Sequence, residues 1–375
     1  MKKILIVGGG FAGLSSARVF SKSGLELDIT LVDRKATSDF LPTLPDCLGR
    51  GIDPGFLAYP IADAAKRMKI KFIHDEISVV NLEKKEAVMK TAVIGYDYLL
   101  IASGSETNFY SNENIRQNAF KMDGAADASR LRGVLKAKIF STYIIAGGGY
   151  TGIEVATNLR LFSRKNKKEA AIVIIERAPQ ILGPLAQWMK DYVAGNLKYL
   201  NIEVLTDTSI ERIEENMVYA SRGRAFENAL VVWAAGVKTG TFIQDLKLEK
   251  NPQGRIKVDE YLKINDSCFV AGDAAYFARK NIYLRMAVQF AIVQGEIAAR
   301  NIMNSIKGRN LVKYRPLDLG YIIPMANNRS CGRILFINMK GLLPTIFHFI
   351  MCIYRSRGLR NKKGILQGLI TGGKR

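Results

Sequence analysis

Short apolar runs open the chain and predict a repeating order of strands and helices. Lys2–Val7 and Asp28–Val32 are rich in Ile, Leu and Val and have the length of buried strands, while the stretch between them has helical character. Thr142–Ala146 and Ala171–Ile175 repeat this strand, helix, strand order in the middle of the chain. Such alternation predicts an α/β fold with two similar halves.

Each half carries a glycine motif between its first strand and its helix. Lys2–Val7 runs into Gly8–Gly13 (GGGFAG), and Thr142–Ala146 runs into Gly147–Gly152 (GGGYTG). In the pattern G-x-G-x-x-G, the first glycine permits a tight turn and the second lets the backbone approach a pyrophosphate. The third lets the helix pack closely on the strand. We therefore assign these roles to Gly8, Gly10 and Gly13, and again to Gly147, Gly149 and Gly152.

An acidic residue closes the second strand of each half. Asp33 and Glu176 are placed to bond the hydroxyl groups of an adenosine ribose. A single motif of this kind could be a glycine turn that binds nothing. Two matches in the same context predict two dinucleotide sites.

Three further strands end in small residues where the backbone could approach a ligand. Tyr96–Ala102 leads into Gly104, and Leu230–Trp233 leads into Gly236. In Cys268–Ala275 we expect a short strand, a turn at Gly272, and Asp273 at the start of a helix, where its carboxylate could accept hydrogen bonds from backbone and ligand. The simpler alternative for Asp273 is a helix N-cap.

The remaining patterns are weaker. Ala62–Met68 and Trp188–Leu200 have helical character, and Lys71–Ile73 and Ala87–Met89 are predicted as strands of a small accessory sheet. Asp39–Pro45 is an apolar loop that its prolines keep from forming a regular helix.

The formal net charge of +21 suggests an anionic partner: nucleic acid, a membrane surface or an acidic protein. Residues 297–375 contain fifteen Lys and Arg and one acid, Asp318, so +14 of this charge lies in the last fifth of the chain. No stacking aromatic residues interleave the charges, which argues against nucleic acid.

The cysteines indicate neither a disulfide framework nor a metal site. Cys47, Cys268, Cys331 and Cys352 are widely spaced and form no C-x-x-C motif. We expect them to be reduced and mostly in the core, in a cytosolic setting. No signal peptide is predicted, and no apolar run reaches the ~18 residues that a membrane-spanning helix needs.

The C-terminal tail combines apolar and basic segments. Leu342–Tyr354 is strongly apolar but too short to span a bilayer, and it leads into the basic stretch 355–363. Ile365, Leu366, Leu369 and Ile370 then have the spacing of one helical face. This order predicts interfacial anchoring to anionic lipids. The alternative is a core helix followed by solvated charges.

Taken together, these motifs resemble those of the flavoprotein reductases with two dinucleotide sites, and most closely those of the type II NADH dehydrogenases, which are single-subunit NADH:quinone oxidoreductases. The resemblance covers essentially the whole chain. The segments that carry it are Phe40–Leu44, Tyr96–Asn108, Gly147–Glu154, Val232–Val237 and Gly272–Ala275.

The resemblance implies FAD on the first glycine unit and NADH on the second. The implied FAD-binding residues are Gly8, Gly10, Phe11, Ala12, Gly13, Asp33, Arg34, Ala102, Gly104, Gly272, Asp273, Val288 and Gln289. The implied NADH-binding residues are Gly147, Gly149, Gly152, Glu176 and Gly236. NADPH stays open as the donor, because Arg177 beside Glu176 could accommodate a 2′-phosphate.

The residues implied in catalysis are Glu154, Gln289 and Gln294. Glu154 would lie at the edge of the flavin and help to protonate or position the acceptor; the alternative is an acid favoured at a helix N-terminus. The quinone-side signature Ala-Gln-x-Ala-x-Gln-Gln-Gly corresponds to Val288–Gly295. Val288 and Val293 depart from it, and Val293 removes an amide. Met286–Arg300 could also be a packed helix with incidental glutamines.

We therefore expect an FAD domain in two segments (1–119 and 247–330), an NAD(P)H domain (120–246) and a membrane-anchoring region (331–375). The expected function is transfer of two electrons from NADH through FAD to a membrane quinone, at the cytoplasmic side of the cell membrane. Self-association as a homodimer stays open.

Three other functions compete with this hypothesis. A sulfide:quinone oxidoreductase needs a pair of cysteines at the flavin, and the second glycine loop contains none, although Cys331 could supply one sulfur. A soluble ferredoxin-type reductase would not explain the basic, apolar tail. A nucleotide-sensing flavin-binding scaffold would hold FAD that NADH cannot reduce.

Overall fold

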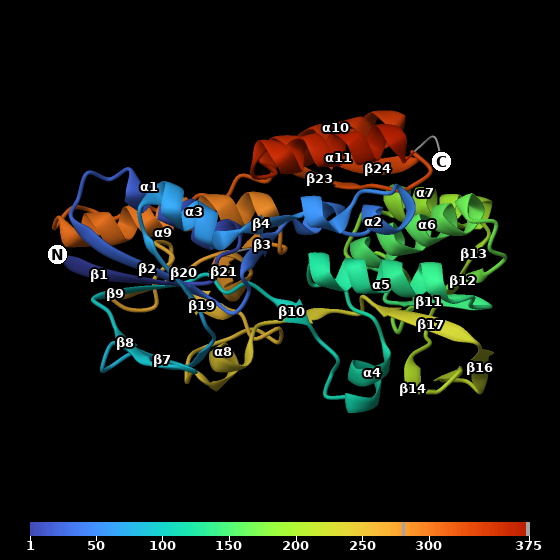
Figure 1. The fold of residues 1–375 in the computed structure, drawn as a ribbon, viewed down its shortest axis with the longest axis horizontal. Coiled ribbons are helices and arrows are strands. Elements are labelled where there is room, and N and C mark those ends of the chain that lie inside the picture. Colours follow the sequence, from blue (N-terminus) through green and yellow to red (C-terminus); the bar gives the residue numbers. More distant parts are fainter. Residues whose placement is uncertain (280–281, 373–375) are drawn as a thin grey trace. The chain divides into compact units, whose positions relative to one another are not determined.

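The computed structural model describes residues 1–279 and 282–372 and shows the alternating order of strands and helices that the sequence predicts (Figure 1). Residues 373–375 of the predicted tail therefore lie outside the described residues. The chain forms two compact units. The first comprises Met1–Ser38, Pro60–Glu106 and Val237–Asp318, and the second comprises Asp39–Tyr59, Thr107–Gly236 and the chain from Leu319 onward.

A parallel sheet of five strands forms the centre of the first unit, in the order β20-β9-β1-β2-β5. Its strands are β20 (Cys268–Val270), β9 (Tyr98–Ile101), β1 (Lys2–Val7), β2 (Leu27–Asp33) and β5 (Lys71–His74). Ile4, Leu5, Ile6 and Val7 are all buried, because a parallel sheet is covered on both faces.

Helices and small sheets complete the first unit. Helix α1 packs against α9, and α3 packs against α1. The helices are α1 (Phe11–Ser21), α3 (Ile61–Met68), α8 (Thr241–Asp245) and α9 (Val288–Ile306). The small sheets contain β6 (Ile77–Asn81), β7 (Glu86–Met89) and β8 (Val93–Gly95), and β19 (Ile256–Val258), β21 (Ala275–Arg279) and β22 (Ile282–Tyr283).

The second unit repeats the architecture with a parallel sheet of four strands, in the order β13-β12-β11-β17. Its strands are β13 (Ile202–Leu205), β12 (Ala171–Ile175), β11 (Thr142–Ala146) and β17 (Ala229–Trp233). Its helices are α2 (Asp46–Gly49), α4 (Glu113–Asn118), α5 (Ala125–Ala137), α6 (Tyr150–Lys165), α7 (Gln187–Tyr199), α10 (Leu342–Arg355) and α11 (Leu359–Thr371).

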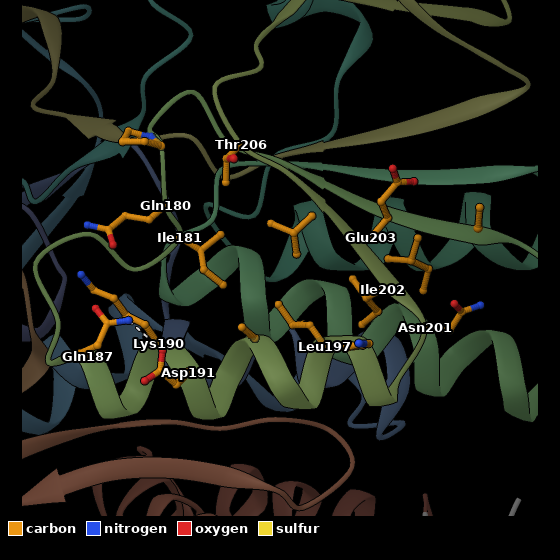
Figure 2. A pocket seen from close by; sticks show the side chains of 16 residues that line it. Gln180, Ile181, Gln187, Lys190, Asp191, Leu197, Asn201, Ile202, Glu203 and Thr206 are labelled. Atoms are coloured by element: carbon orange, nitrogen blue, oxygen red, sulfur yellow. Dashed lines mark hydrogen bonds between the residues drawn. The ribbon is translucent and has the colours of Figure 1, made fainter.

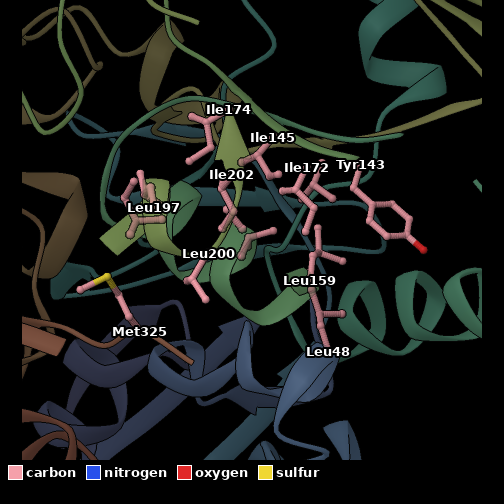
Figure 3. Packing of buried hydrophobic residues seen from close by; sticks show 14 of the residues in the cluster. Leu48, Tyr143, Ile145, Leu159, Ile172, Ile174, Leu197, Leu200, Ile202 and Met325 are labelled. Carbon is pink, nitrogen blue, oxygen red and sulfur yellow. The ribbon is translucent and has the colours of Figure 1, made fainter. Parts of the chain in front are cut away.

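Alternating side chains of β11 enter two cores on opposite faces of this sheet. Tyr143 and Ile145 pack with residues of α5, α6 and α7, among them Leu159 and Leu197 (Figure 3). Ile144 and Ala146 pack with residues of an antiparallel sheet that contains β14 (Ile210–Glu214), β15 (Met217–Ala220) and β16 (Arg224–Glu227). The period of two residues explains this division.

The C-terminal region is part of the second unit. Strands β23 (Gly320–Ile323), β24 (Ser330–Ile334) and β25 (Ile337–Gly341) form an antiparallel sheet that α10 contacts. Helix α10 buries Phe349 and Cys352, and α11 buries Ile365. The predicted apolar segment is thus a helix that packs on its own unit with one face.

Short elements complete the list. The remaining strands are β3 (Thr37–Asp39), β4 (Ala58–Pro60), β10 (Glu106–Thr107) and β18 (Val237–Lys238). The 3-10 turns are η1 (Leu41–Thr43), η2 (Pro54–Phe56) and η3 (Gly272–Ala274). Asp39–Pro45 contains η1 and no α-helix, as predicted.

Two local predictions were wrong. Lys71–Ile73 is not in an accessory sheet, because β5 is the edge strand of the main parallel sheet beside β2. Asp273 does not start an α-helix: it lies in the three-residue 3-10 turn η3, which is followed directly by strand β21. Both outcomes depend on pairing with distant strands, which the local pattern does not contain.

Two findings concern the whole described part of the chain. All four cysteines are buried, as predicted. Among the residues that the structure describes, no helix combines the length and the apolar character that a membrane crossing requires.

Candidate functional site

The first glycine loop has the geometry that the roles assigned to Gly8, Gly10 and Gly13 require. Gly8 has a φ of +109°, and a side chain there would collide with the backbone carbonyl of Ala102. A side chain at Gly13 would collide with the carbonyl of Gly8. The close turn and the close packing of α1 on β1 therefore both require glycine.

Gly10 differs from its neighbours because the space beside it is open. A Cβ atom built on Gly10 meets no atom within 4 Å, and the residue is the N-cap of α1, with φ −78° and ψ −158°. Phe11 and Ala12 begin the helix, and Ala12 is buried. The open backbone at a helix N-terminus is the arrangement that accepts a phosphate. The residues present therefore fit a dinucleotide.

Asp33 is fixed at this loop. Its Oδ2 accepts a hydrogen bond of 2.6 Å from the amide of Gly9, and its Oδ1 accepts one of 2.7 Å from the amide of Lys35. The neighbouring Arg34 forms ion pairs with Glu106 (2.7 Å) and Glu76 (3.7 Å). Gly8, Asp33 and Arg34 line one cavity of about 250 Å³.

A second group of predicted FAD residues meets at the turn η3. Gly272 has a φ of +73°, and a Cβ there would lie 3.1 Å from the Cβ of Ala12. The carboxylate of Asp273 accepts a hydrogen bond of 2.9 Å from Ser105 Oγ, next to Gly104. Burial raises the pKa of Asp273.

Gln294 holds this turn. Its Oε1 accepts a hydrogen bond of 2.8 Å from the amide of Gly272, and the side chain is buried. The next residue, Gly295, lies so close to Ala12 that a side chain would collide with the Ala12 backbone. The structure thus gives Gln294 a contact with the turn that the sequence did not indicate.

Arg255 is a further residue that sequence reasoning missed. It is 2% exposed and donates hydrogen bonds to the carbonyls of Asp273 (3.0 Å), Leu284 (3.0 Å) and Ala275 (2.6 Å). The buried guanidinium therefore fixes the carbonyls of the turn, while Gln294 bonds its amide. Arg255 lies in a segment for which the sequence predicted no helix or strand, so the sequence did not indicate this role.

Gln289 and Val288 lie at the start of α9 and are both partly exposed. The amide of Gln289 donates a hydrogen bond of 3.0 Å to Asp318, whose carboxylate also pairs with Arg285. Val293, the departure from the quinone-side signature, is 42% exposed. Asp318 was noted only as an isolated acid in the basic region.

The second glycine loop repeats the geometry of the first. Gly147 has a φ of +107°, and a side chain at Gly152 would collide with the carbonyl of Gly147. Gly149 is the N-cap of α6, and a Cβ there meets no atom within 4 Å. Glu176 accepts hydrogen bonds from the amides of Gly148 (2.6 Å) and Ala178 (2.8 Å).

Tyr110 connects this site to Gly236. Its hydroxyl donates a hydrogen bond of 2.8 Å to the carbonyl of Ala235, and Gly236 has a φ of +136°. The guanidinium of Arg177 lies 5.9 Å from the centroid of the Tyr110 ring. Sequence reasoning missed Tyr110, which lies in a segment without a strong pattern.

Glu154 lies on the first turns of α6 and is partly exposed. Burial, and then the charge of Asp46, raise the pKa of its carboxyl well above the ordinary value. Among the described residues no hydrogen bond to this carboxyl occurs, and the bonds that Glu154 accepts are to its backbone carbonyl. An acid of this kind can act as a general acid near neutral pH.

One hollow of the second unit does not coincide with the predicted site. An open groove of about 820 Å³ lies between α7 and the strands β12 and β13, with Gln187, Lys190 and Glu203 on its walls (Figure 2). None of the predicted site residues lines it. It has no glycine loop and no strand-end acid, so it cannot supply the contacts of a dinucleotide site.

No metal centre is found in the described part of the chain: its His, Cys, Asp and Glu residues form no group of three or more that could hold an ion. Cys331 is buried in the core of the second unit, where burial raises its pKa to about 12.

Curated relatives match the chain over nearly its full length. The type II NADH:quinone oxidoreductase of Staphylococcus haemolyticus is 26% identical over 369 residues, which cover 91% of each chain. Among solved structures, NDH2 from Plasmodium falciparum in complex with NADH has a TM-score of 0.87, at 18% identity, and covers 99% of this chain and 98% of that one.

The fold alone does not separate the competing functions. The sulfide:quinone oxidoreductase from Aquifex aeolicus has a TM-score of 0.79 at 17% identity and covers 98% of this chain and 93% of that one. At these identities the likeness to solved structures concerns the fold. The family model described as pyridine nucleotide-disulphide oxidoreductase matches residues 2–295. With its two glycine loops and strand-end acids, the chain belongs to the pyridine nucleotide-disulphide oxidoreductase family.

Proposed function

We propose that the protein is an NADH:quinone oxidoreductase that uses FAD. The observation that carries this proposal is the pair of glycine loops with the same geometry, each with an open second glycine and an acid bonded to the loop. The full-length similarity to type II NADH:quinone oxidoreductases supports the choice of donor and acceptor. Reduction of the bound flavin by NADH, followed by oxidation by a quinone, tests it.

FAD is assigned to the first unit and NADH to the second. The support is that Gly8, Asp33 and Arg34 share a cavity, while Ser105, Asp273 and Gln294 surround the turn at Gly272. The domain boundaries proposed from the sequence are 1–119 with 247–330 for FAD and 120–246 for NADH. The compact units divide the chain at other residues, with 39–59 and 107–119 in the second unit and 237–246 in the first. When bound, FAD supplies two-electron chemistry between a nicotinamide and a quinone.

The chain's own residues then bind and orient the reactants. The amides at Gly10 and Gly149 face pyrophosphate groups, and Asp33 and Glu176 bond ribose hydroxyls. Glu154 holds a proton for the acceptor, which its raised pKa favours near neutral pH. Gln289 is proposed as a contact of the electron acceptor. Gln294, which belongs to the same sequence motif, holds the turn at Gly272.

A quinone is favoured over a sulfide as the reactant. Sulfide oxidation at a flavin uses two cysteines, and all four cysteines here are buried. Cys331, the candidate that the sequence left open, packs among Ile323 and Met325 in the core of the second unit. A thiol with a raised pKa in such a place is inert.

We further propose that the C-terminal region, 331–375, binds the cytoplasmic surface of the cell membrane. Helix α10 has an exposed apolar face opposite the face that packs inward, and the turn between β24 and β25 is also apolar. The exposed apolar residues are Leu335, Phe336, Ile337, Leu342, Leu343, Ile346, Phe347, Ile350, Met351, Tyr354, Leu359, Leu366 and Ile370.

The basic residues of the same region complement this apolar surface. Arg355, Arg357, Arg360, Lys362 and Lys363 lie at the end of α10 and the start of α11. Apolar side chains can enter the acyl boundary while these cations meet anionic headgroups, each contributing about 1 kcal/mol near the surface. A quinone dissolved in lipid would then reach the enzyme from the membrane.

The nucleotide preference is predicted to favour NADH. Glu176 repels a 2′-phosphate, whereas Arg177 is held over the ring of Tyr110. We expect kcat/KM for NADH to exceed that for NADPH by about tenfold or more. Steady-state rates with both donors measure this ratio, and Glu176→Ala should narrow it while Arg177→Ala should not. A clear preference for NADPH in the unchanged protein would contradict the assignment.

A further inference from the structure

Three helices of the second unit each contribute a polar pair spaced four residues apart to one region. In each pair one residue is buried and the other is partly exposed. The spacing places both members of a pair on one side of a helix. The pairs are Asp46 and Arg50 at α2, Glu154 and Asn158 on α6, and His348 and Cys352 on α10.

Several contacts bring these pairs together. The Nε of Arg50 lies 3.0 Å from Asp46 Oδ1, and its guanidinium lies 4.9 Å from the centroid of the Phe349 ring on α10. Gly49 of α2 lies against Asn158, because a Cβ there would be 2.8 Å from Asn158 Oδ1. The amide of Asn158 donates a hydrogen bond of 3.0 Å to the carbonyl of Glu154, and Asn158 lowers the pKa of the Asp46 carboxyl against the effect of burial. Helix α2 is thus fixed to both α6 and α10.

The protonation states in this cluster differ from those of exposed groups. Burial raises the pKa of Asp46 to about 6, against the opposing charge of Arg50. Burial and the charge of Asp46 raise that of Glu154 well above its ordinary value. A negative charge on Asp46 therefore disfavours ionisation of Glu154, in addition to the effect of burial.

The other titratable groups near the two acids are His348, Cys352, Lys165 and Arg355. Burial lowers the pKa of His348 to about 4, so its imidazole is neutral at pH 7, and its Nε2 lies 3.4 Å from Cys352 Sγ. Burial raises the pKa of the Cys352 thiol, which keeps its proton. Lys165 lies near Arg50, and Arg355 near Cys352.

We propose that Asp46 is a positioning residue for the proton that Glu154 supplies when the quinone is reduced. This inference rests on the proposed function. Converting a quinone to a quinol adds two electrons and two protons, and NADH brings two electrons and one proton as a hydride. The second proton leaves the carboxyl of Glu154 as a quinone oxygen gains an O–H bond. Solvent then returns a proton to the acid pair.

The test is the pH dependence of the second half of the reaction. Protein reduced under anaerobic conditions is mixed with a short-tailed quinone in a stopped-flow instrument, and flavin oxidation is followed from about pH 6 to 9.5. In the unchanged protein we expect the rate to fall at high pH, as the acid pair loses its proton. Asp46→Asn removes the negative neighbour, so Glu154 ionises more readily and the fall moves to lower pH by about one unit or more.

Controls separate this role from a structural one. Glu154→Gln should lower the rate at neutral pH and remove the fall at high pH. Asp191→Asn, at an exposed acid on α7, should leave the profile unchanged. Because Asp46→Asn removes the ion-pair partner of Arg50 and could impair folding, the double variant Asp46→Asn, Arg50→Gln is measured as well. Its profile should also move to lower pH, since Asp46 and not Arg50 raises the pKa of Glu154.

The outcomes are distinguishable. A flat profile in the unchanged protein, or profiles of both Asp46 variants that coincide with it, would overturn the role of Asp46 and leave the proposed function intact. Reduced protein that no quinone oxidises at any pH would instead overturn the proposed function.

Discussion

Replacing Gly10 with Val should give protein that folds and purifies without flavin. The backbone at Gly10 is extended, which Val readily adopts, and no atom lies within 4 Å of the new Cβ. The added side chain therefore fills only the space in which we place the FAD pyrophosphate. Loss of about two hydrogen bonds to a charged group costs about 3 kcal/mol or more, which weakens binding at least about a hundredfold. The absorbance ratio of flavin to protein measures the result.

Gly149→Val is the matched variant at the second loop. Its backbone is also extended, with φ −79° and ψ −172°, and the space beside it is equally open. This variant should keep its flavin but need about a hundredfold more NADH to reduce it. Gly133→Val, at an exposed helical position with open space, should change neither property. Flavin retained in Gly10→Val and lost in Gly149→Val would reverse the assignment of the two sites.

Introducing aspartate at Ile346 and Ile350 should release the protein from anionic vesicles. These residues are 45% and 55% exposed and lie one turn apart on the outer face of α10. Each isoleucine removed from the acyl boundary costs about 1.5 kcal/mol, so the pair should lower partitioning about a hundredfold. Sedimentation with vesicles of anionic lipid at physiological salt measures the bound fraction.

Surface substitutions test the anchor better than truncation does. Removing α10 and α11 would also remove Phe349, Cys352 and Ile365 from the core of the second unit. Ile139→Asp, at an apolar residue 76% exposed between α5 and β11, is the control and should bind vesicles normally. We expect the α10 variant to reduce a short-tailed quinone normally and a long-tailed quinone in liposomes slowly. Unchanged vesicle binding in this variant would refute the anchor.

The nucleotide loops could be predicted because their requirements are local. A strand, a glycine turn and a helix follow one another within about a dozen residues, so the steric demands on Gly8 and Gly13 are visible in the order of residues. Several strands, such as β1, β11 and β12, also have the predicted bounds, since each is a buried apolar run with a clear end.

The errors and omissions concern contacts between distant segments. The hydrogen bond of Ser105 to Asp273 joins residues 168 positions apart, and no local pattern indicates it. The contact of Gln294 with Gly272 and the three hydrogen bonds of Arg255 depend likewise on how strands and helices meet. Helix α10 shows the same difficulty, because its apolar pattern alone could not show which face packs inward.

The central claim is that electrons pass from NADH through a bound flavin to a quinone, and one anaerobic titration tests it directly. NADH is added to the purified protein until the flavin absorbance is bleached, and a quinone is then added without oxygen. We predict that NADH bleaches the flavin in a 1:1 ratio, as a two-electron donor requires, and that the quinone restores the absorbance. Flavin that NADH does not bleach would favour a binding scaffold, and bleached flavin that only a sulfur acceptor restores would contradict quinone reduction.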